Sequence, residues 1–185
     1  TEARTMAARG YAGVVAYTRG KGRSPQSPIP YEHDGDDARA VIAWIVRRAW
    51  SDGRVGMYGG SYDGFTQWAA AKKPPTALKT IVPYVANNPG NGLPMENNVF
   101  PFANYAWPFY TTNNKSLDNE TYFDTDRWNA LNERWYLSGQ SYRAADRIDG
   151  TPNPWFQRWL QHPSYDRYWQ RMTPYGREFA KIDIP

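Results

Sequence analysis

The serine in the stretch VGMYGGSYDGFTQW is surrounded by small residues and is the strongest candidate for chemistry in the chain. Gly59 and Gly60 precede Ser61, and Gly64 follows three residues later. A serine nucleophile on a sharp strand-to-helix turn has a strained backbone, which requires small neighbours. The N–H of Tyr62, at the start of the helix, would face the negative charge that develops on a substrate carbonyl. The pattern predicts that Ser61 is a nucleophile with a positive φ angle.

Two other interpretations of this turn stay open. Position 63 is Asp63, so the strict G-x-S-x-G pattern is not met. A glycine-rich turn can also bind phosphate at a helix N-terminus, or it can be a plain structural turn. Phosphate binding is disfavoured because the chain lacks a lysine at P-loop spacing and lacks G-x-G-x-x-G. Asp63 is expected to stabilise the first turn of the helix, where negative charge is favoured.

A serine nucleophile needs a general base, and the chain has only two histidines. His33 precedes a predicted helix and His162 precedes Pro163. Neither is expected to reach the Ser61 hydroxyl, so both are interpreted as structural. The absence of cysteines excludes disulfides, thiolate metal ligands and a cysteine nucleophile. We expect no metal and no cofactor.

The elements that must position Ser61 alternate between strands and helices. Short apolar, β-branched runs predict strands at 11–18, 54–59 and 78–85. Helical spacing of apolar residues predicts helices that end near residue 9, span 36–50 and span 62–71. Asp34 or Asp36 is expected to cap the second helix. Strands and helices that alternate in this way predict an α/β fold with a parallel sheet.

The pattern changes after residue 86, where a turn-rich linker leads into an aromatic and polar region. Helices are predicted there at 124–137 and 153–161, and EFAKIDIP is interpreted as the lead-in to another strand. The predicted domains are a partial core at 1–86, a helical cap at 87–177 and a lead-in to a further core strand at 178–185.

Composition excludes several classes of protein. Apolar residues make up 41% of the chain, which is typical of a globular domain. No apolar run approaches the about 20 residues that cross a membrane, and the start shows no signal-peptide pattern. The net charge of +4 comes from dispersed lysines and arginines, so no nucleic-acid partner is expected. Nine tryptophans and fourteen tyrosines indicate either a well-filled core or an aromatic pocket.

GGSYDG resembles the G-x-S-Y-x-G turn of the α/β-hydrolase serine hydrolases of the CocE/NonD, peptidase S15 type. That family includes cocaine esterase, α-amino acid ester hydrolases and Xaa-Pro dipeptidyl-peptidases. The resemblance extends to RGYAGVVAYTRGKGRS, PYEHDGDDARAVIAWI, ALKTIVPYV and HPSYDRYW, and so covers most of the chain. It implies a fragment of an α/β-hydrolase parallel sheet with a helical cap insertion. It further implies that strand 54–59 pairs with 78–85, while a vacant position one strand wide separates it from 11–18.

The resemblance also implies the chemistry. Ser61 would form an acyl-enzyme with a small ester or amide substrate, and the Tyr62 N–H would bind the oxyanion. A second oxyanion donor, a tyrosine hydroxyl, is expected before Thr1, and the catalytic Asp and His after Pro185. The chain alone is therefore expected to be inactive, with the remainder of the hydrolase domain as its partner. No membrane partner is expected, the oligomeric state stays open, and the relatives favour a secreted or periplasmic location.

The substrate itself stays open among esters, amino esters, β-lactam amides and Xaa-Pro peptides. Glu96 falls near the acidic residue that receives a substrate ammonium in the amino acid ester hydrolases, although a solvated loop residue is the alternative. The cap residues expected nearest Ser61 are the aromatic residues Tyr105, Trp107, Phe109 and Tyr110. Arg19 is expected to pin its loop through backbone carbonyls rather than to bind a substrate carboxylate. The competing function is a non-catalytic fragment or binding module that keeps the fold and an aromatic pocket.

Overall fold

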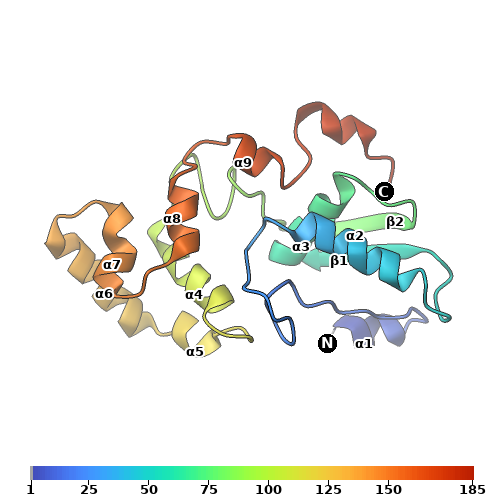
Figure 1. Cartoon of the computed structure of the whole chain (residues 1–185), viewed down its shortest axis with the longest axis horizontal. Helices are drawn as coiled ribbons and strands as arrows, with labels where there is room; N and C mark the ends of the chain where they lie inside the picture. Colours follow the sequence, from blue (N-terminus) through green and yellow to red (C-terminus); the bar gives the residue numbers. More distant parts are fainter. Residues whose placement is uncertain (1) are drawn as a thin grey trace. The chain divides into compact units, whose positions relative to one another are not determined.

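The structure, a computed structural model, describes residues 2–185, with the side chains at positions 102 and 103 left aside. The described chain forms two compact units (Figure 1). The sheet unit contains residues 2–19, Tyr31–Asn87 and Arg171–Pro185, and the helical unit contains Gly20–Pro30 and Asn88–Gln170. The domain boundaries 1–86, 87–177 and 178–185 stay a prediction. The two observed units differ from the predicted domains in two segments. Loop 20–30 belongs to the helical unit, and residues 171–177 belong to the sheet unit.

Two parallel strands form the centre of the sheet unit. Strand β1 (Val55–Gly60) pairs with β2 (Leu78–Tyr84), with Met57 opposite Ile81 and Gly60 opposite Tyr84. Helix α3 (Ser61–Ala71) connects them, as a parallel pair requires a crossover. The predicted pairing of these two strands is confirmed.

Helices α2 (Asp34–Ile45) and α3 contact each other and pack against the sheet (Figure 1). The core between them is formed by apolar residues that are almost fully buried: Ile42, Ala70, Ala71, Leu78 and Ile81. The three successive alanines at the end of α3, Ala69, Ala70 and Ala71, are all buried, and their small side chains allow close packing. The other face of the sheet exposes the large side chains Tyr58, Val82 and Tyr84. The sheet unit therefore buries one face of its strands and leaves the other open to solvent.

The strand predicted at 11–18 is wrong. Helix α1 (Glu2–Ala7) is followed by a turn with Gly10 at φ 87°, and residues 12–18 then run as irregular chain. Val15 is 62% exposed and Tyr17 is 77% exposed, so the segment is not buried either. A strand exists only with a hydrogen-bonded neighbour, and within the described residues this segment forms no ladder. The vacant position between this segment and β1 stays a prediction.

The end of the chain returns to the sheet unit. A 3₁₀ helix, η3 (Gly176–Lys181), is held to α3 by an ion pair of 2.5 Å between Glu178 and Lys72. Beyond it, the carbonyl of Pro185 accepts a hydrogen bond of 2.9 Å from the N–H of Ile81 on β2. Residues 182–185 form no strand, but this bond places their end beside the outer edge of β2.

The helical unit consists of short helices joined by tight turns. In chain order these are η1 (Phe102–Tyr105), α4 (Ala106–Thr112), α5 (Asn119–Tyr122), α6 (Thr125–Ser138), η2 (Tyr142–Ala144), α7 (Ala145–Asp149), α8 (Pro154–Leu160) and α9 (Arg167–Gln170). The side chains of Asp124 and Asn153 cap α6 and α8, and Gly139 ends α6 in a left-handed conformation. The helices predicted at 124–137 and 153–161 are confirmed within one or two residues. No helix among the described residues is long and apolar enough to cross a membrane.

Two lysines join loop 20–30 to the loop before α5 within the helical unit. The Lys115 ammonium donates to the carbonyls of Gly20, Ser24 and Gln26 at 2.8, 2.6 and 3.1 Å. In return, the buried Lys21 ammonium donates to the carbonyls of residues 114 and 116 at 2.6 and 2.9 Å. Each lysine thus donates hydrogen bonds to backbone carbonyls of the other lysine's loop. Burial lowers the pKa of Lys21.

Candidate functional site

Ser61 lies at the junction of β1 and α3 and is exposed to solvent. Its backbone φ angle is 54°. The left-handed region is unusual for a residue with a side chain and is typical of strained functional positions. The predicted positive φ of Ser61 is confirmed. We call Gly59–Gly64 the elbow.

Small residues are required at both ends of the elbow. Gly59 has φ 148°, and a Cβ there would lie 2.6 Å from the Cβ of Asp63. A Cβ on Gly64 would lie 2.7 Å from the Cβ of Ala86, just beyond β2. The buried Gln67 of α3 fixes the same region, because its side chain donates to the Gly59 carbonyl at 3.1 Å. The glycines are therefore needed for close packing as well as for the turn.

Asn87 lies beside the Ser61 side chain. The two residues share a backbone hydrogen bond of 3.1 Å, from the Asn87 N–H to the Ser61 carbonyl. The Ser61 hydroxyl lies 3.5 Å from Asn87 Oδ1, at the outer limit of a hydrogen bond. Asn87 Nδ2 in turn donates to the Tyr31 hydroxyl at 3.0 Å. The side chain beside the Ser61 hydroxyl is thus an amide, and among the described residues no histidine is hydrogen-bonded to this hydroxyl.

The Tyr62 side chain ends in a buried polar cluster. Its hydroxyl donates to Asp34 Oδ2 at 2.8 Å and accepts from the Tyr31 N–H at 2.8 Å. The other carboxylate oxygen of Asp34 accepts from the Thr18 hydroxyl at 3.3 Å. Burial raises the pKa of Asp34 to about 6, although the hydrogen bonds from Tyr62 and Thr18 oppose the rise. Sequence reasoning missed this cluster: Asp34 was expected as a helix cap, but His33 is the N-cap and makes no side-chain capping bond.

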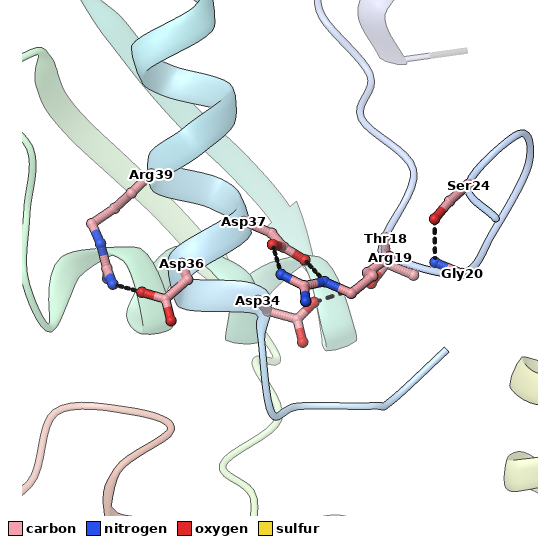
Figure 2. A network of polar contacts seen from close by, with 8 residues as sticks. All are labelled: Thr18, Arg19, Gly20, Ser24, Asp34, Asp36, Asp37 and Arg39. Atoms are coloured by element: carbon pink, nitrogen blue, oxygen red, sulfur yellow. Dashed lines mark hydrogen bonds and ion pairs between the residues drawn. The ribbon is translucent and has the colours of Figure 1, made fainter. Parts of the chain in front are cut away.

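Figure 2 shows two carboxylates at the start of α2, Asp34 and Asp37, pointing toward Thr18 and Arg19. The carboxylate of Asp36 instead contacts Arg39 on the same helix. The Arg19 guanidinium makes a two-pronged contact with the Asp37 carboxylate, at 3.0 and 2.5 Å. The expectation that Arg19 bonds to backbone carbonyls is therefore corrected, since a carboxylate one turn into the helix is the better partner for a planar guanidinium. The contacts of Thr18 with Asp34 and of Arg19 with Asp37 attach the chain before loop 20–30 to the start of α2. The Tyr62 hydroxyl is bound at the same end of this helix.

The aromatic candidates all belong to the helical unit. Tyr105 and Phe109 are buried in its core, where the Tyr105 ring contacts Phe109 at 5.4 Å and Phe156 at 5.0 Å. Trp107 and Tyr110 are only half-buried. The Trp107 ring packs against Trp159 at 6.0 Å, and the Tyr110 ring packs against Tyr122 at 4.6 Å, both between ring centroids. A role for these four residues near Ser61 stays a prediction.

Glu96 lies at an exposed turn of the helical unit. Glu96 and Val99 form an isolated antiparallel bridge, with both backbone hydrogen bonds present at 2.7 and 2.8 Å. The two residues at the tip, Asn97 and Asn98, have positive φ angles of 49° and 66°. The turn is therefore well defined and presents the Glu96 carboxylate to solvent. Its role in binding a substrate ammonium stays a prediction.

Neither histidine has the surroundings of a general base for Ser61. The His33 carbonyl accepts the Asp37 N–H at 2.9 Å, as the residue before a helix does. His162 Nδ1 lies 2.7 Å from the Asp166 carboxylate, and its ring stacks on Tyr168 at 4.1 Å. These contacts hold His162 within the helical unit. No cluster of three or more histidine, cysteine or acidic side chains among the described residues is arranged to hold a metal ion.

The profile of one protein family, X-Pro dipeptidyl-peptidase (S15 family), matches residues 1–185. The chain belongs to the S15 family. Cocaine esterase from Rhodococcus sp. is 30% identical over 178 residues, covering 91% of this chain and 31% of the esterase. A putative Xaa-Pro dipeptidyl-peptidase from Bacillus cereus is 34% identical over 96 residues, covering 42% of this chain and 16% of the relative.

A solved structure also shares the fold. The crystal structure of a CocE/NonD family hydrolase from Staphylococcus aureus superposes with a TM-score of 0.58, at 22% identity, over 91% of this chain and 25% of that one. At this identity the likeness concerns the fold alone. It agrees with the small parallel sheet and its helices as part of an α/β fold. The S15 chain described here spans about a third of the length of cocaine esterase and less of the other two proteins.

Proposed function

We propose that this S15 chain supplies the nucleophile of a serine hydrolase that acts on small esters or amides. Ser61 attacks the substrate carbonyl and forms an acyl-enzyme, while the Tyr62 N–H donates to the oxyanion of the tetrahedral intermediate. The observation that carries the proposal is the strained φ of 54° at Ser61, between a strand and a helix start. This is the geometry in which a serine hydroxyl is exposed beside free helix N–H groups.

The proposal assigns the general base and its acid to residues outside this chain. The Ser61 hydroxyl faces an amide oxygen, which orients a hydroxyl but does not take its proton at neutral pH. The chain therefore acts only together with the remainder of the hydrolase domain.

The proposed substrate site combines the helical unit's aromatic and acidic candidates. The rings of Trp107 and Tyr110 are half-buried and would contact an apolar acyl group, while Tyr105 and Phe109 lie in the core of the helical unit. The exposed Glu96 carboxylate would bind the ammonium of an amino-ester or a peptide N-terminus.

The experiment is active-site labelling of the full-length protein with a fluorophosphonate probe. We expect stoichiometric labelling that is lost in Ser61→Ala, with hydrolysis of p-nitrophenyl esters lost in parallel. A folded protein that neither labels nor hydrolyses any ester, amino ester or Xaa-Pro anilide overturns the proposal. It would favour the second candidate, a non-catalytic fragment or binding module with an aromatic pocket.

Glu96 is tested with matched substrates. Glu96→Gln should raise KM for an amino acid p-nitrophenyl ester with a free amine and leave KM for the N-acetylated ester unchanged. An equal effect on both esters, or none on either, removes Glu96 from the substrate site without touching the role of Ser61.

A further inference from the structure

The Tyr62 side chain is held much more firmly than catalysis by its backbone N–H would require. Its ring packs against Tyr31 at 5.0 Å and Phe65 at 5.4 Å. Its hydroxyl donates one hydrogen bond and accepts another, both at 2.8 Å. The ring thus has contacts along its length and at its tip, so the direction of the Cα–Cβ bond of Tyr62 is fixed. These contacts restrain the position of the first turn of α3, which carries the N–H of the same residue.

Asp34 accepts the hydrogen bond from the Tyr62 hydroxyl and is unusual because its carboxylate is buried. It is 6% exposed, and its two oxygens accept from the hydroxyls of Tyr62 and Thr18. The nearest guanidinium, that of Arg19, is engaged by Asp37 instead. Burying a carboxylate with neutral partners alone is costly for stability, because the charge loses its water.

We propose that Asp34 is a positioning residue that acts through the Tyr62 side chain to orient the oxyanion-binding N–H. This inference rests on the proposed function of Ser61 and Tyr62. Asp34, at the first position of α2, anchors the tip of the ring, and α3 carries the N–H at the other end. Loss of the anchor lets the first turn of α3 move beside Ser61, where an oxyanion donor must meet the transition state within a few tenths of an ångström.

The test compares three variants of the full-length protein. Tyr62→Phe keeps the ring and removes the hydroxyl. Asp34→Ala removes the acceptor, and Asp34→Asn keeps an amide oxygen that can accept from the Tyr62 hydroxyl. Each is measured for kcat and KM with p-nitrophenyl acetate and for inhibition by phenylboronic acid. The boronate forms a tetrahedral anionic adduct on the nucleophile and so reports on the oxyanion site.

In Tyr62→Phe and Asp34→Ala we expect kcat to fall by about ten- to a hundredfold with KM nearly unchanged. The inhibition constant of phenylboronic acid should rise by a similar factor. Asp34→Asn should recover most of both losses. Tyr62→Phe preserves the packing, so it keeps the test valid if Asp34→Ala does not fold.

Two results overturn the inference in distinguishable ways. If Ser61→Ala abolishes hydrolysis but Tyr62→Phe leaves kcat and boronate inhibition unchanged, the positioning role is wrong and the proposed function stands. If Ser61→Ala retains wild-type hydrolysis and labelling, the proposed function fails and the inference fails with it.

Discussion

Gly64 lies in the first turn of α3, where the helix approaches the chain beyond β2 too closely for any side chain. A Cβ at this position would lie 2.7 Å from the Cβ of Ala86 and 2.9 Å from its Cα. Non-bonded carbon atoms normally stay about 3.5–4.0 Å apart. Ala86 has no side-chain rotamer to change, so the overlap is relieved only if α3 moves away by roughly 1 Å. That movement displaces the elbow.

The expected cost of Gly64→Ala is the balance of two effects. Alanine in a helix interior is favoured over glycine by about 1 kcal/mol, whereas overpacking of a tight site costs about 1–3 kcal/mol. We therefore expect the free energy of unfolding of Gly64→Ala to fall by about 0–2 kcal/mol, which lowers Tm by up to a few degrees. The fall should be larger in Gly64→Val. Catalysis should suffer more than stability, because a displacement of about 1 Å near the reacting atoms lowers the rate by about a hundredfold.

The assay is thermal unfolding and ester hydrolysis of the full-length protein, with Gly60→Ala as the matched control for stability. A Cβ on Gly60 would also meet a neighbour, the Tyr84 ring, at 2.4 Å. That ring belongs to a residue that is 49% exposed and can turn away into solvent. Gly60 also has φ −105°, which alanine adopts freely. A Gly64→Ala variant as stable as Gly60→Ala, with wild-type kcat/KM, would refute the close-packing argument.

Three further predictions concern strain, pH and loop anchoring. Ser61→Gly should abolish probe labelling without lowering Tm, because glycine adopts the φ of 54° without the about 1–2 kcal/mol cost that a side chain imposes; a clear drop in Tm would contradict the strain. The folded pKa of Asp34 is about 6, above its unfolded value, so the folded protein binds the extra proton between about pH 4 and pH 6 and loses stability as pH rises through this window. The loss between pH 4 and pH 7 should be about 2 kcal/mol in denaturant titrations, measured relative to Asp34→Asn. Equal changes in the two proteins would contradict it. Lys115→Met should speed hydrogen exchange in loop 20–30, whereas Lys79→Met, at an exposed site on β2, should leave that loop unchanged; equal exchange in both variants would show that the Lys115 contacts do not hold the loop.

The elbow could be predicted from sequence because its constraints are local. Ser61 and the glycines beside it lie within one turn of chain, so residue type and spacing alone require a positive φ and close packing. The pairing of β1 with β2 was predictable from the resemblance to the α/β-hydrolases, and the structure agrees with it. The segment 11–18 has the same apolar, β-branched pattern but forms no strand, because strand formation depends on a partner that the pattern does not contain.

The contacts around Asp34 could not be predicted because they join residues far apart in the chain. The sequence places Asp34 at a helix start, where a capping role is the usual expectation. Its actual partners, Tyr62 and Thr18, depend on how α2 and α3 pack against each other. The partner of Arg19 could not be predicted for the same reason. The sequence indicates that Arg19 anchors its loop, but its contact with Asp37 depends on how the chain folds back onto α2.

The chain passes between its two units four times, after residues 19, 30, 87 and 170. Two units joined in this way are not separable domains on a single linker, and one proteolytic cut would leave them connected. Residues at two of the crossings are hydrogen-bonded to the elbow, Tyr31 to the Tyr62 hydroxyl and Asn87 to the Ser61 carbonyl. At a third crossing, Arg19 is bound to Asp37 in the first turns of α2. A force on the helical unit is therefore expected to reach residues 31 and 87 through the covalent backbone, and Tyr62 and Ser61 through their hydrogen bonds.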